Sequence, residues 1–221
     1  MTKIIAILAL GWTTLSSSHA GQGAVDPSAY DHPVRVACVG ASITQGVGAH
    51  PGKSYPSQLQ AILGSKWIVK NFGVSGRTMT RKGDSPYWTA PAFKDAHDLN
   101  PDVVVILLGT NDTKPNNWKH HDEFYGDCRD LIESFKQLPA RPHVFICRLP
   151  PVTEPGNYGI VPANLTIEQP LIEKAAADEH AGLIDVYGAL ILKPQLLPDH
   201  VHPNDEGAAI IAQTVARAIE K

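Results

Sequence analysis

The sequence has little cysteine, no long apolar run and no large excess of charge of either sign. Its 221 residues carry 19 Lys and Arg against 22 Asp and Glu, which gives a formal net charge of −3. Such a balance produces no strong basic field, so it argues against a nucleic acid or an anionic membrane as partner. Internal repeats, heptads and low-complexity tracts are also lacking, and the length suits one globular domain.

The cysteines are Cys38, Cys128 and Cys147, an odd set without the spacing of metal ligands. Cys38 and Cys147 lie in apolar, strand-like runs, and Cys128 lies in a helix-like segment. We therefore interpret all three as small buried hydrophobic side chains. The sequence leaves a disulfide open.

The first twenty residues differ in character from the rest. Lys3 precedes an apolar run over 4–10, and a small, polar stretch ends at Ala20. This three-part pattern predicts a signal peptide over residues 1–20 with cleavage after Ala20, and therefore a secreted or periplasmic protein. A disordered N-terminus is the alternative. The apolar run is too short to span a bilayer as a helix, so we expect no stable membrane insertion.

Five short apolar runs alternate with helical stretches in the remaining sequence. Several runs are nearly continuous, as is typical of parallel strands covered on both faces. The pattern predicts an α/β fold, a three-layer α/β/α sandwich around a five-stranded parallel, flavodoxin-like sheet. We assign residues 21–33 to an N-terminal linker and 34–221 to the domain. Pro170 is expected to kink or split its helix. The runs lie at 34–40, 66–71, 102–109, 143–149 and 182–187, and the helical stretches at 56–64, 120–138, 163–181 and after the cap Asn204.

Polar or small residues follow the first three runs. In parallel sheets, sites form at the carboxyl ends of strands, where Ser42, Gly73 and Asn111 are expected. A serine at a tight turn exposes its hydroxyl, a glycine lets its N–H approach a ligand, and an asparagine donates through its amide. Each residue alone has an ordinary explanation as a turn residue, and Asn111 also begins an N-glycosylation pattern. Their joint position therefore matters more than any one of them.

The segment PDHVHPN, residues 198–204, supplies an acid and two imidazoles. Asp199 and His202 are three positions apart, so in a turn the carboxylate can accept a hydrogen bond from the imidazole Nδ1. His200 is adjacent to Asp199 and points away from it. We predict His202 as a general base supported by Asp199, and His200 as a residue at the rim of the site. Together with the strand-end residues, this is the set needed for acyl transfer.

In order, the motifs GASIT, NFGVSG, GTND and DHVH resemble the four blocks of the SGNH hydrolases, also called GDSL-type esterases. The resemblance covers about residues 34–218 and is closest to the sialate or carbohydrate O-acetylesterase branch. One departure is Ala41, where the first block of the family usually has Asp. The residues that carry the family's Ser, Gly, Asn and His are Ser42, Gly73, Asn111 and His202, with the acid at Asp199.

The resemblance implies a serine carboxylester hydrolase without cofactor or metal. Ser42 would be the nucleophile, His202 the base and Asp199 the residue that orients it. The oxyanion hole would comprise the N–H groups of Ser42 and Gly73 and the side-chain amide of Asn111.

The substrate is expected to be an ester of a small molecule or polysaccharide, with a short acyl group because no long apolar lid separates the motifs. Trp88 and Trp118 offer flat faces that suit sugar rings, although aromatic residues more often anchor loops. Arg77 and Lys114 are candidate contacts for an acidic sugar such as sialate or uronate. The expected substrate is therefore a sialate- or xylan-type acetyl ester.

Three alternatives stay open at this point. The same machinery serves a short-chain thioesterase or lysophospholipase, and a non-catalytic carbohydrate-binding relic could retain the fold. A metal site could use His200 and His202, or the run KHHDE at 119–123, although that run suits a solvated helix start. The oligomeric state is not predicted.

Overall fold

The computed structural model describes residues 23–154 and 158–221. Five parallel strands form one sheet in the order β2-β1-β3-β4-β5. This is the order of flavodoxin-like, doubly wound sheets, so the predicted fold class is confirmed. The strands are β1 (Val34–Gly40), β2 (Trp67–Gly73), β3 (Val103–Leu107), β4 (His143–Cys147) and β5 (Gly182–Ile184).

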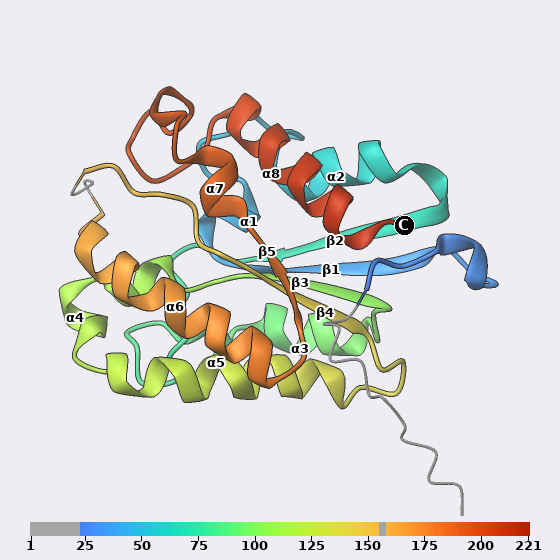
Figure 1. Cartoon of the computed structure of the whole chain (residues 1–221), viewed down its shortest axis with the longest axis horizontal. Coiled ribbons are helices and arrows are strands. Elements are labelled where there is room, and N and C mark those ends of the chain that lie inside the picture. The colour runs from blue at the N-terminus through green and yellow to red at the C-terminus, as the bar shows by residue number, and fades with distance from the viewer. Residues whose placement is uncertain (1–22, 155–157) are drawn as a thin grey trace, which may run out of the picture.

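Helices cover both faces of the sheet and complete the three layers (Figure 1). In that view α2, α7 and α8 lie above the sheet, and α3, α5 and α6 lie below it. Helix α2 packs against α8, and α5 packs against α6. The α-helices are α1 (Ser42–Gln45), α2 (Tyr55–Leu63), α3 (Pro91–Asp98), α4 (Pro115–Trp118), α5 (His121–Lys136), α6 (Pro162–Asp178), α7 (Val186–Leu190) and α8 (Asp205–Ile219). The 3₁₀ turns are η1 (Pro27–Ala29), η2 (Gly64–Lys66), η3 (Tyr87–Thr89), η4 (Thr110–Thr113) and η5 (Pro194–Leu196).

The predicted helix cap at Asn204 is confirmed. Its side chain caps α8 by accepting from the Gly207 N–H, and at the start of α2 the Ser54 side chain accepts from the Ser57 N–H. The expected split of the third helix is wrong, because α6 continues through Pro170 as one helix.

Four strand ends differ from the sequence-based limits. Strands β3 and β4 end at Leu107 and Cys147, each two residues earlier than expected. The fifth strand ends at Ile184 because the Asp185 carboxylate accepts from the Gly188 N–H and so caps α7. The second strand extends beyond its expected end at Asn71 and pairs with β1 as far as Gly73. The extension of β2 changes which glycine reaches the site.

The core is centred on the middle strands. All five residues of β3 are buried, and β1 is buried at every position except Arg35. These are the nearly continuous apolar runs of the sequence, and burial on both faces explains why they do not alternate. Cys38, Cys128 and Cys147 are buried and unpaired, as the hydrophobic interpretation predicts.

The segment expected to be a linker contacts the domain where the structure describes it. The backbone of Val25 bonds to Ile219 and Lys221 at 2.7 and 3.1 Å. The His32 imidazole lies 3.2 Å from the Asp102 carboxylate, which is buried beside β3. The predicted signal peptide, residues 1–20, lies outside the described residues.

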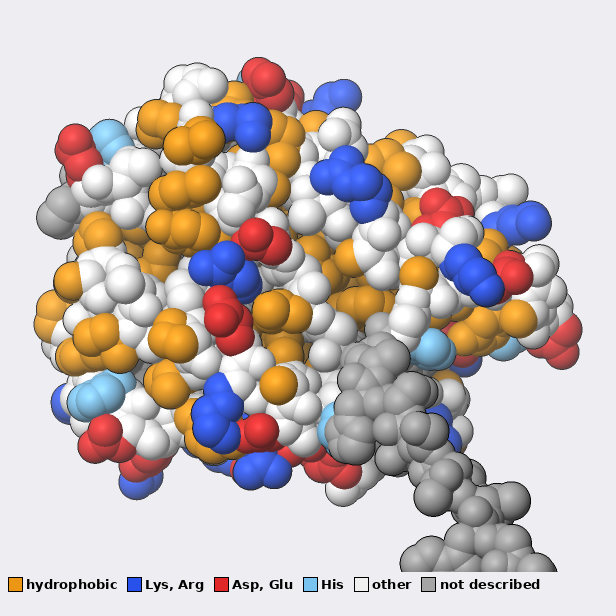
Figure 2. All heavy atoms as spheres, viewed as in Figure 1, with side chains coloured by type: hydrophobic (Ala, Val, Ile, Leu, Met, Phe, Trp, Pro, Cys, Tyr) orange, Lys and Arg blue, Asp and Glu red, His pale blue; other side chains and the backbone are white. Residues whose placement is uncertain are grey.

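The surface carries mixed charge. On the face shown in Figure 2, basic and acidic side chains are interspersed rather than gathered by sign. No helix within residues 23–154 and 158–221 has the length and hydropathy required to cross a bilayer.

Candidate active site

Ser42 lies where β1 ends and α1 begins. Gly40 closes the strand next to β3, and a Cβ atom there would lie 2.4 Å from the carbonyl oxygen of Leu107. Gly46, at φ +109°, ends α1 after one turn. This tight strand–turn–helix passage leaves the Ser42 hydroxyl at the carboxyl edge of the sheet.

A hydrogen-bonded series joins the serine to the C-terminal loop. The Ser42 Oγ lies 2.9 Å from His202 Nε2, and His202 Nδ1 lies 2.7 Å from Asp199 Oδ2. The imidazole is buried, with 4% of the residue exposed. Three side chains that sequence analysis singled out, separated by up to 160 positions, therefore come together in bonding order.

Asp199 is held in the orientation that this series requires. Its Oδ1 accepts from the backbone N–H groups of Val201 and His202 at 3.1 and 2.7 Å. Partial burial opposes ionisation, but these N–H donors and the imidazole hold the pKa of the Asp199 carboxyl below its usual value. The carboxylate form, which stabilises the Nδ1-protonated tautomer, is thus favoured.

His200 does not join the series. Its Nδ1 lies 3.0 Å from the Thr153 hydroxyl, and its side chain is 44% exposed. The backbone of His200 has φ +68°, which turns this side chain away from the one at position 202. His200 therefore lies where the sequence placed it, outside the reacting groups.

Asn111 lies at the same edge, in η4 directly after β3. One N–H of its amide donates to the Arg77 carbonyl at 3.0 Å, which leaves the second N–H of Nδ2 for another acceptor. The Asn117 amide donates to the Asn111 carbonyl at 2.9 Å and holds this turn from behind. Asn111 lines the same cavity as Ser42 and His202.

The prediction that Gly73 donates to an oxyanion is not supported. Its N–H donates to Asn71 Oδ1 at 2.9 Å, and Gly73 does not line the cavity. A Cβ atom at Gly73 would lie 2.2 Å from the Gln45 nitrogen, so this glycine permits close packing of β2 against α1.

Gly76 takes the place expected of Gly73. It lines the cavity, adopts φ +81°, and its N–H donates to no acceptor in the described part of the chain. Sequence analysis missed it because β2 extends two residues further than expected, so that the loop begins at Val74 rather than at Phe72. The second glycine of NFGVSG was the available signal.

The cavity at this edge has a volume of about 160 Å³. Its walls are mostly small or apolar, and the Tyr158 ring meets the His202 ring edge-on at a centroid distance of 4.9 Å. The tyrosine is 47% exposed and forms part of the mouth. Besides the groups described above, the lining comprises Val47, Ser75, Thr110, Lys114, Tyr158, Ile160 and Val201.

Of the predicted substrate contacts, only Lys114 lines this cavity. The Trp88 indole donates to the Met79 carbonyl at 2.9 Å, and the Arg81 guanidinium lies 3.8 Å above its ring. The Trp118 ring stacks on His121 at 4.8 Å. Both tryptophans thus anchor loops.

The Arg77 side chain also bonds within the protein, through Nη1 to the Pro86 carbonyl at 3.3 Å. Neither the histidines of the C-terminal loop nor the run at 119–123 builds a metal centre. Within the described ranges, no group of three His, Cys, Asp or Glu side chains is arranged to hold a metal ion.

A Ser–His–Asp series at the β1–β3 edge of a flavodoxin-like sheet is the arrangement of the SGNH type of α/β hydrolase. The chain also matches the model of the GDSL-like lipase/acylhydrolase family over residues 38–210, and it belongs to this family of ester hydrolases. The predicted family is therefore confirmed.

Relatives agree with this placement. An acetylxylan esterase of Xylanibacter ruminicola is 38% identical over 216 residues, a match that covers 88% of this chain and 45% of the relative. This chain thus spans less than half of that protein. Two solved structures share the fold. A carbohydrate acetylesterase family member from Sinorhizobium meliloti has a TM-score of 0.67 at 21% identity, covering 83% of this chain and 96% of its own. The acetyl xylan esterase AlAXEase has a TM-score of 0.65 at 23% identity, and the match covers 83% of this chain and 98% of the AlAXEase chain.

Proposed function

We propose that this protein is a serine carboxylester hydrolase that removes acetyl groups from carbohydrate. The observation that carries the proposal is the series Ser42 Oγ–His202 Nε2–Nδ1–Asp199 Oδ2, with links of 2.9 and 2.7 Å. A carbohydrate-binding module has no need of a base held against a hydroxyl, so this series favours an enzyme over a non-catalytic relic.

The proposed reaction has two halves. The Ser42 Oγ attacks the ester carbonyl while His202 Nε2 takes its proton, and His202 then gives that proton to the departing alcohol. A water molecule next attacks the acyl-serine, with His202 again as base. The acid leaves and the Ser42 hydroxyl is restored. Asp199 stabilises the imidazolium that forms twice in each cycle.

The negative oxygen of each tetrahedral intermediate would be held by three donors. These are the Ser42 N–H at the first turn of α1, the Gly76 N–H, and the second N–H of the Asn111 amide. Each is attached to a buried or backbone element, so it needs little reorganisation when charge develops.

The substrate class is proposed from the cavity and the relatives. A cavity of about 160 Å³, walled by Val47, Ile160 and Val201, suits a short acyl group better than a long chain. The acetylxylan esterase relative supports an acetylated sugar as the alcohol side. Lys114, the basic residue of the lining, is placed to meet a carboxylate on that sugar. Export through the segment 1–20 would bring the enzyme to polysaccharide outside the cytoplasm.

The test is acetate release from acetylated xylan, O-acetylated sialic acid and simple acetylated sugars, together with p-nitrophenyl esters of increasing chain length. Ser42→Ala should abolish turnover, whereas Ser65→Ala, a control at an exposed serine of η2, should leave it unchanged. Near-native turnover by Ser42→Ala would refute the mechanism. Equal rates on octanoyl and acetyl esters would refute the short-acyl proposal and favour a thioesterase or lysophospholipase.

A further inference from the structure

The loop that presents Gly76 has little regular structure of its own. It comprises residues 74–86, between β2 and η3, and will be called the 74–86 loop. Within it, Thr78 forms an isolated bridge with Pro86. Its internal bonds, such as those from the Thr78 N–H to the Ser85 carbonyl at 3.0 Å and from the Gly83 N–H to the Thr80 carbonyl at 3.2 Å, do not include Gly76. The direction of the Gly76 N–H therefore depends on outside contacts as well.

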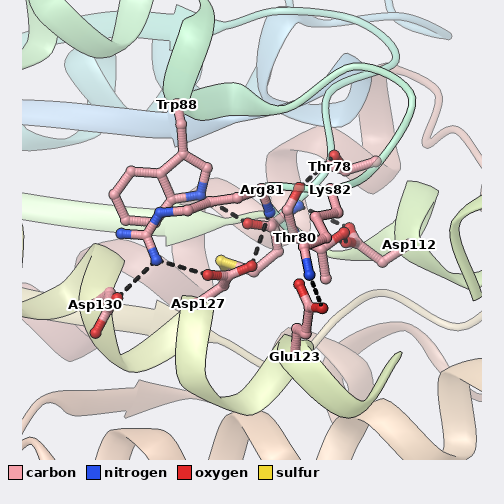
Figure 3. A network of polar contacts seen from close by, with 10 residues as sticks. Thr78, Thr80, Arg81, Lys82, Trp88, Asp112, Glu123, Asp127 and Asp130 are labelled. Carbon is pink, nitrogen blue, oxygen red and sulfur yellow. Dashed lines mark hydrogen bonds and ion pairs between the residues drawn. The ribbon is translucent and has the colours of Figure 1, made fainter. Parts of the chain in front are cut away.

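Before Gly76, the Gln45 Oε1 accepts from the N–H and the hydroxyl of Ser75, each at 2.7 Å. After Gly76, the outside contact is Asp112, which is 2% exposed. Its Oδ2 accepts from the Met79 N–H at 2.8 Å. Its Oδ1 accepts from both the N–H and the hydroxyl of Thr80, each at 2.8 Å. Figure 3 shows this carboxylate facing Thr80 beneath the loop. Three bonds to one buried carboxylate make a strong and directional anchor.

Asp112 acts beside a second anchor from the same turn. Its neighbour Asn111 donates to the carbonyl of Arg77, the residue that follows Gly76. Two consecutive side chains of η4 therefore hold loop positions 77, 79 and 80. The segment that follows Gly76 is thus tied to the turn that carries the Asn111 amide.

A separate cluster holds the loop further from the site. Arg81 pairs with Asp127 and Asp130 of α5, each at 2.6 Å, and Lys82 pairs with Glu123 at 2.6 Å (Figure 3). The Arg81 and Lys82 side chains are 44% and 65% exposed, so water and salt weaken these pairs. Asp127 is itself buried and also accepts from the Arg81 N–H at 2.7 Å, but it holds a position further along the loop from Gly76 than Asp112 does.

The surroundings of Asp112 are unfavourable for its charge. Burial raises the pKa of its carboxyl to about 7, against the effect of the three donors. The titratable groups facing it are Glu168 from α6 and the Cys128 thiol from α5, with Asp127 acting on that thiol. Burial, and then the charge of Asp112, raise the pKa of Glu168 well above its usual value. A protonated Asp112 would accept more weakly from the loop.

We propose that Asp112 is a positioning residue whose carboxylate, through Met79 and Thr80, fixes the 74–86 loop so that the Gly76 N–H meets the reacting carbonyl oxygen. The inference rests on the proposed function. It goes beyond that function because Asp112 does not touch the substrate. Loss of the charge loosens the loop, and the oxyanion donor then moves out of place.

The test compares Asp112→Asn with Glu168→Gln, a matched loss of a buried carboxyl that contacts no loop donor. Turnover of p-nitrophenyl acetate is measured from pH 5.5 to 9, with thermal unfolding as a check of folding. For Asp112→Asn at pH 8 we expect kcat to fall roughly 10- to 100-fold, since a donor misplaced by about 1 Å has effects of this size, with KM within about twofold. Glu168→Gln should retain native kcat at pH 8.

The pH profile distinguishes positioning from a purely structural role. In the native enzyme Asp112 must be deprotonated to hold the loop, so part of the fall of log kcat on the acid side is due to this group. Asp112→Asn lacks the group, and its acid slope should therefore be shallower than that of the native enzyme. A folded Asp112→Asn enzyme with native kcat, with a loss confined to KM, or with an unchanged acid slope would overturn the inference.

A second variant keeps the test decisive if Asp112→Asn does not fold. Thr80→Val removes only the hydroxyl bond, and it should lower kcat several-fold while Thr80→Ser retains it. Equal kcat for the two variants would overturn the inference. Failure of the proposed function is recognised separately, because it requires turnover to survive in Ser42→Ala.

Discussion

Asp199 contacts His202 and Asp112 contacts the 74–86 loop, and each accepts three hydrogen bonds from its neighbours. The pKa of Asp199 is lowered, whereas the pKa of Asp112 is raised to about 7. The Asp199 side chain is 29% exposed and faces an imidazole that can become positive. Asp112 is 2% exposed, and its titratable neighbours are an acid and a thiol.

The comparison shows that the number of donors does not decide the ionisation of a carboxyl. Access to water and the sign of the neighbouring charge outweigh hydrogen bonds of similar length. One aspartate is therefore stable as an anion and supports a charge that develops during reaction. The other is an anion at a cost in stability, which suits a group retained for geometry.

The largest expected effect is a loss of kcat on substitution of Asp199, the more exposed of the two aspartates. Asp199→Asn should lower kcat by roughly 10³- to 10⁴-fold with little change in KM, because an amide donating to Nδ1 would favour the tautomer with its proton on Nε2. That tautomer cannot accept the Ser42 proton. Steady-state kinetics on p-nitrophenyl acetate measures the loss, and a decrease of less than tenfold would show that Asp199 does not orient the base.

The next effect is a change in the free energy of unfolding, compared between the two glycines of NFGVSG, Gly73 and Gly76. Gly73→Ala should lower the free energy of unfolding by about 3 kcal/mol, because its methyl group meets the Gln45 backbone at 2.2 Å. Gly76→Ala meets no atom within 4 Å, but its φ of +81° makes alanine unfavourable by about 1 kcal/mol. Urea unfolding measures both changes. A greater loss of stability for Gly76→Ala would reverse the packing argument.

A smaller effect is the dependence of stability on pH. The folded pKa of Asp112, about 7, lies above its unfolded value, so the folded state holds the additional proton between about pH 4 and 7. The stability due to this group is then present at low pH and lost as pH rises toward 7, by up to about 1.4 kcal/mol per pH unit. Asp112→Asn should lack this slope in urea unfolding from pH 5 to 8. A constant difference from the native protein would show that Asp112 is ionised throughout.

The smallest effect is expected beside the base itself. His200→Ala should change kcat by less than about twofold, because the imidazole bonds to Thr153 at 3.0 Å and is outside the Ser42–His202 series. The same ester assay measures it, with His202→Ala as the inactive counterpart. A hundredfold loss in His200→Ala would exchange the roles of the two histidines.

The sequence predicted most of the fold because its middle strands, β1, β3 and β4, are buried on both faces and therefore appear as continuous apolar runs. It also predicted the Asp199–His202 contact, since a spacing of three in a turn is a local property. The strand end at Gly73 was not predictable in this way. Phe72 and Gly73 belong to β2 only because β1 continues beside them, and this pairing is a tertiary contact.

The role of Asp112 was not predicted from the sequence for a related reason. It lies in a motif whose asparagine offers a clear chemical role, and the sequence does not reveal that a loop some 30 residues earlier bonds to the neighbouring carboxylate. The two tryptophans were overvalued as sugar contacts because their partners, Arg81 and His121, became evident only in the folded chain.

The acid and base enter from the loop that leads into α8, the last helix of the fold. During synthesis, the nucleophile and the donor loop leave the ribosome long before positions 199 and 202 follow. A growing or interrupted chain that stops before position 199 can form much of the sheet and yet has no means to activate its serine. Because α8 packs against α2, docking of this helix and of the loop before it brings positions 199 and 202 to Ser42, so assembly of the site depends on folding of this C-terminal part of the domain.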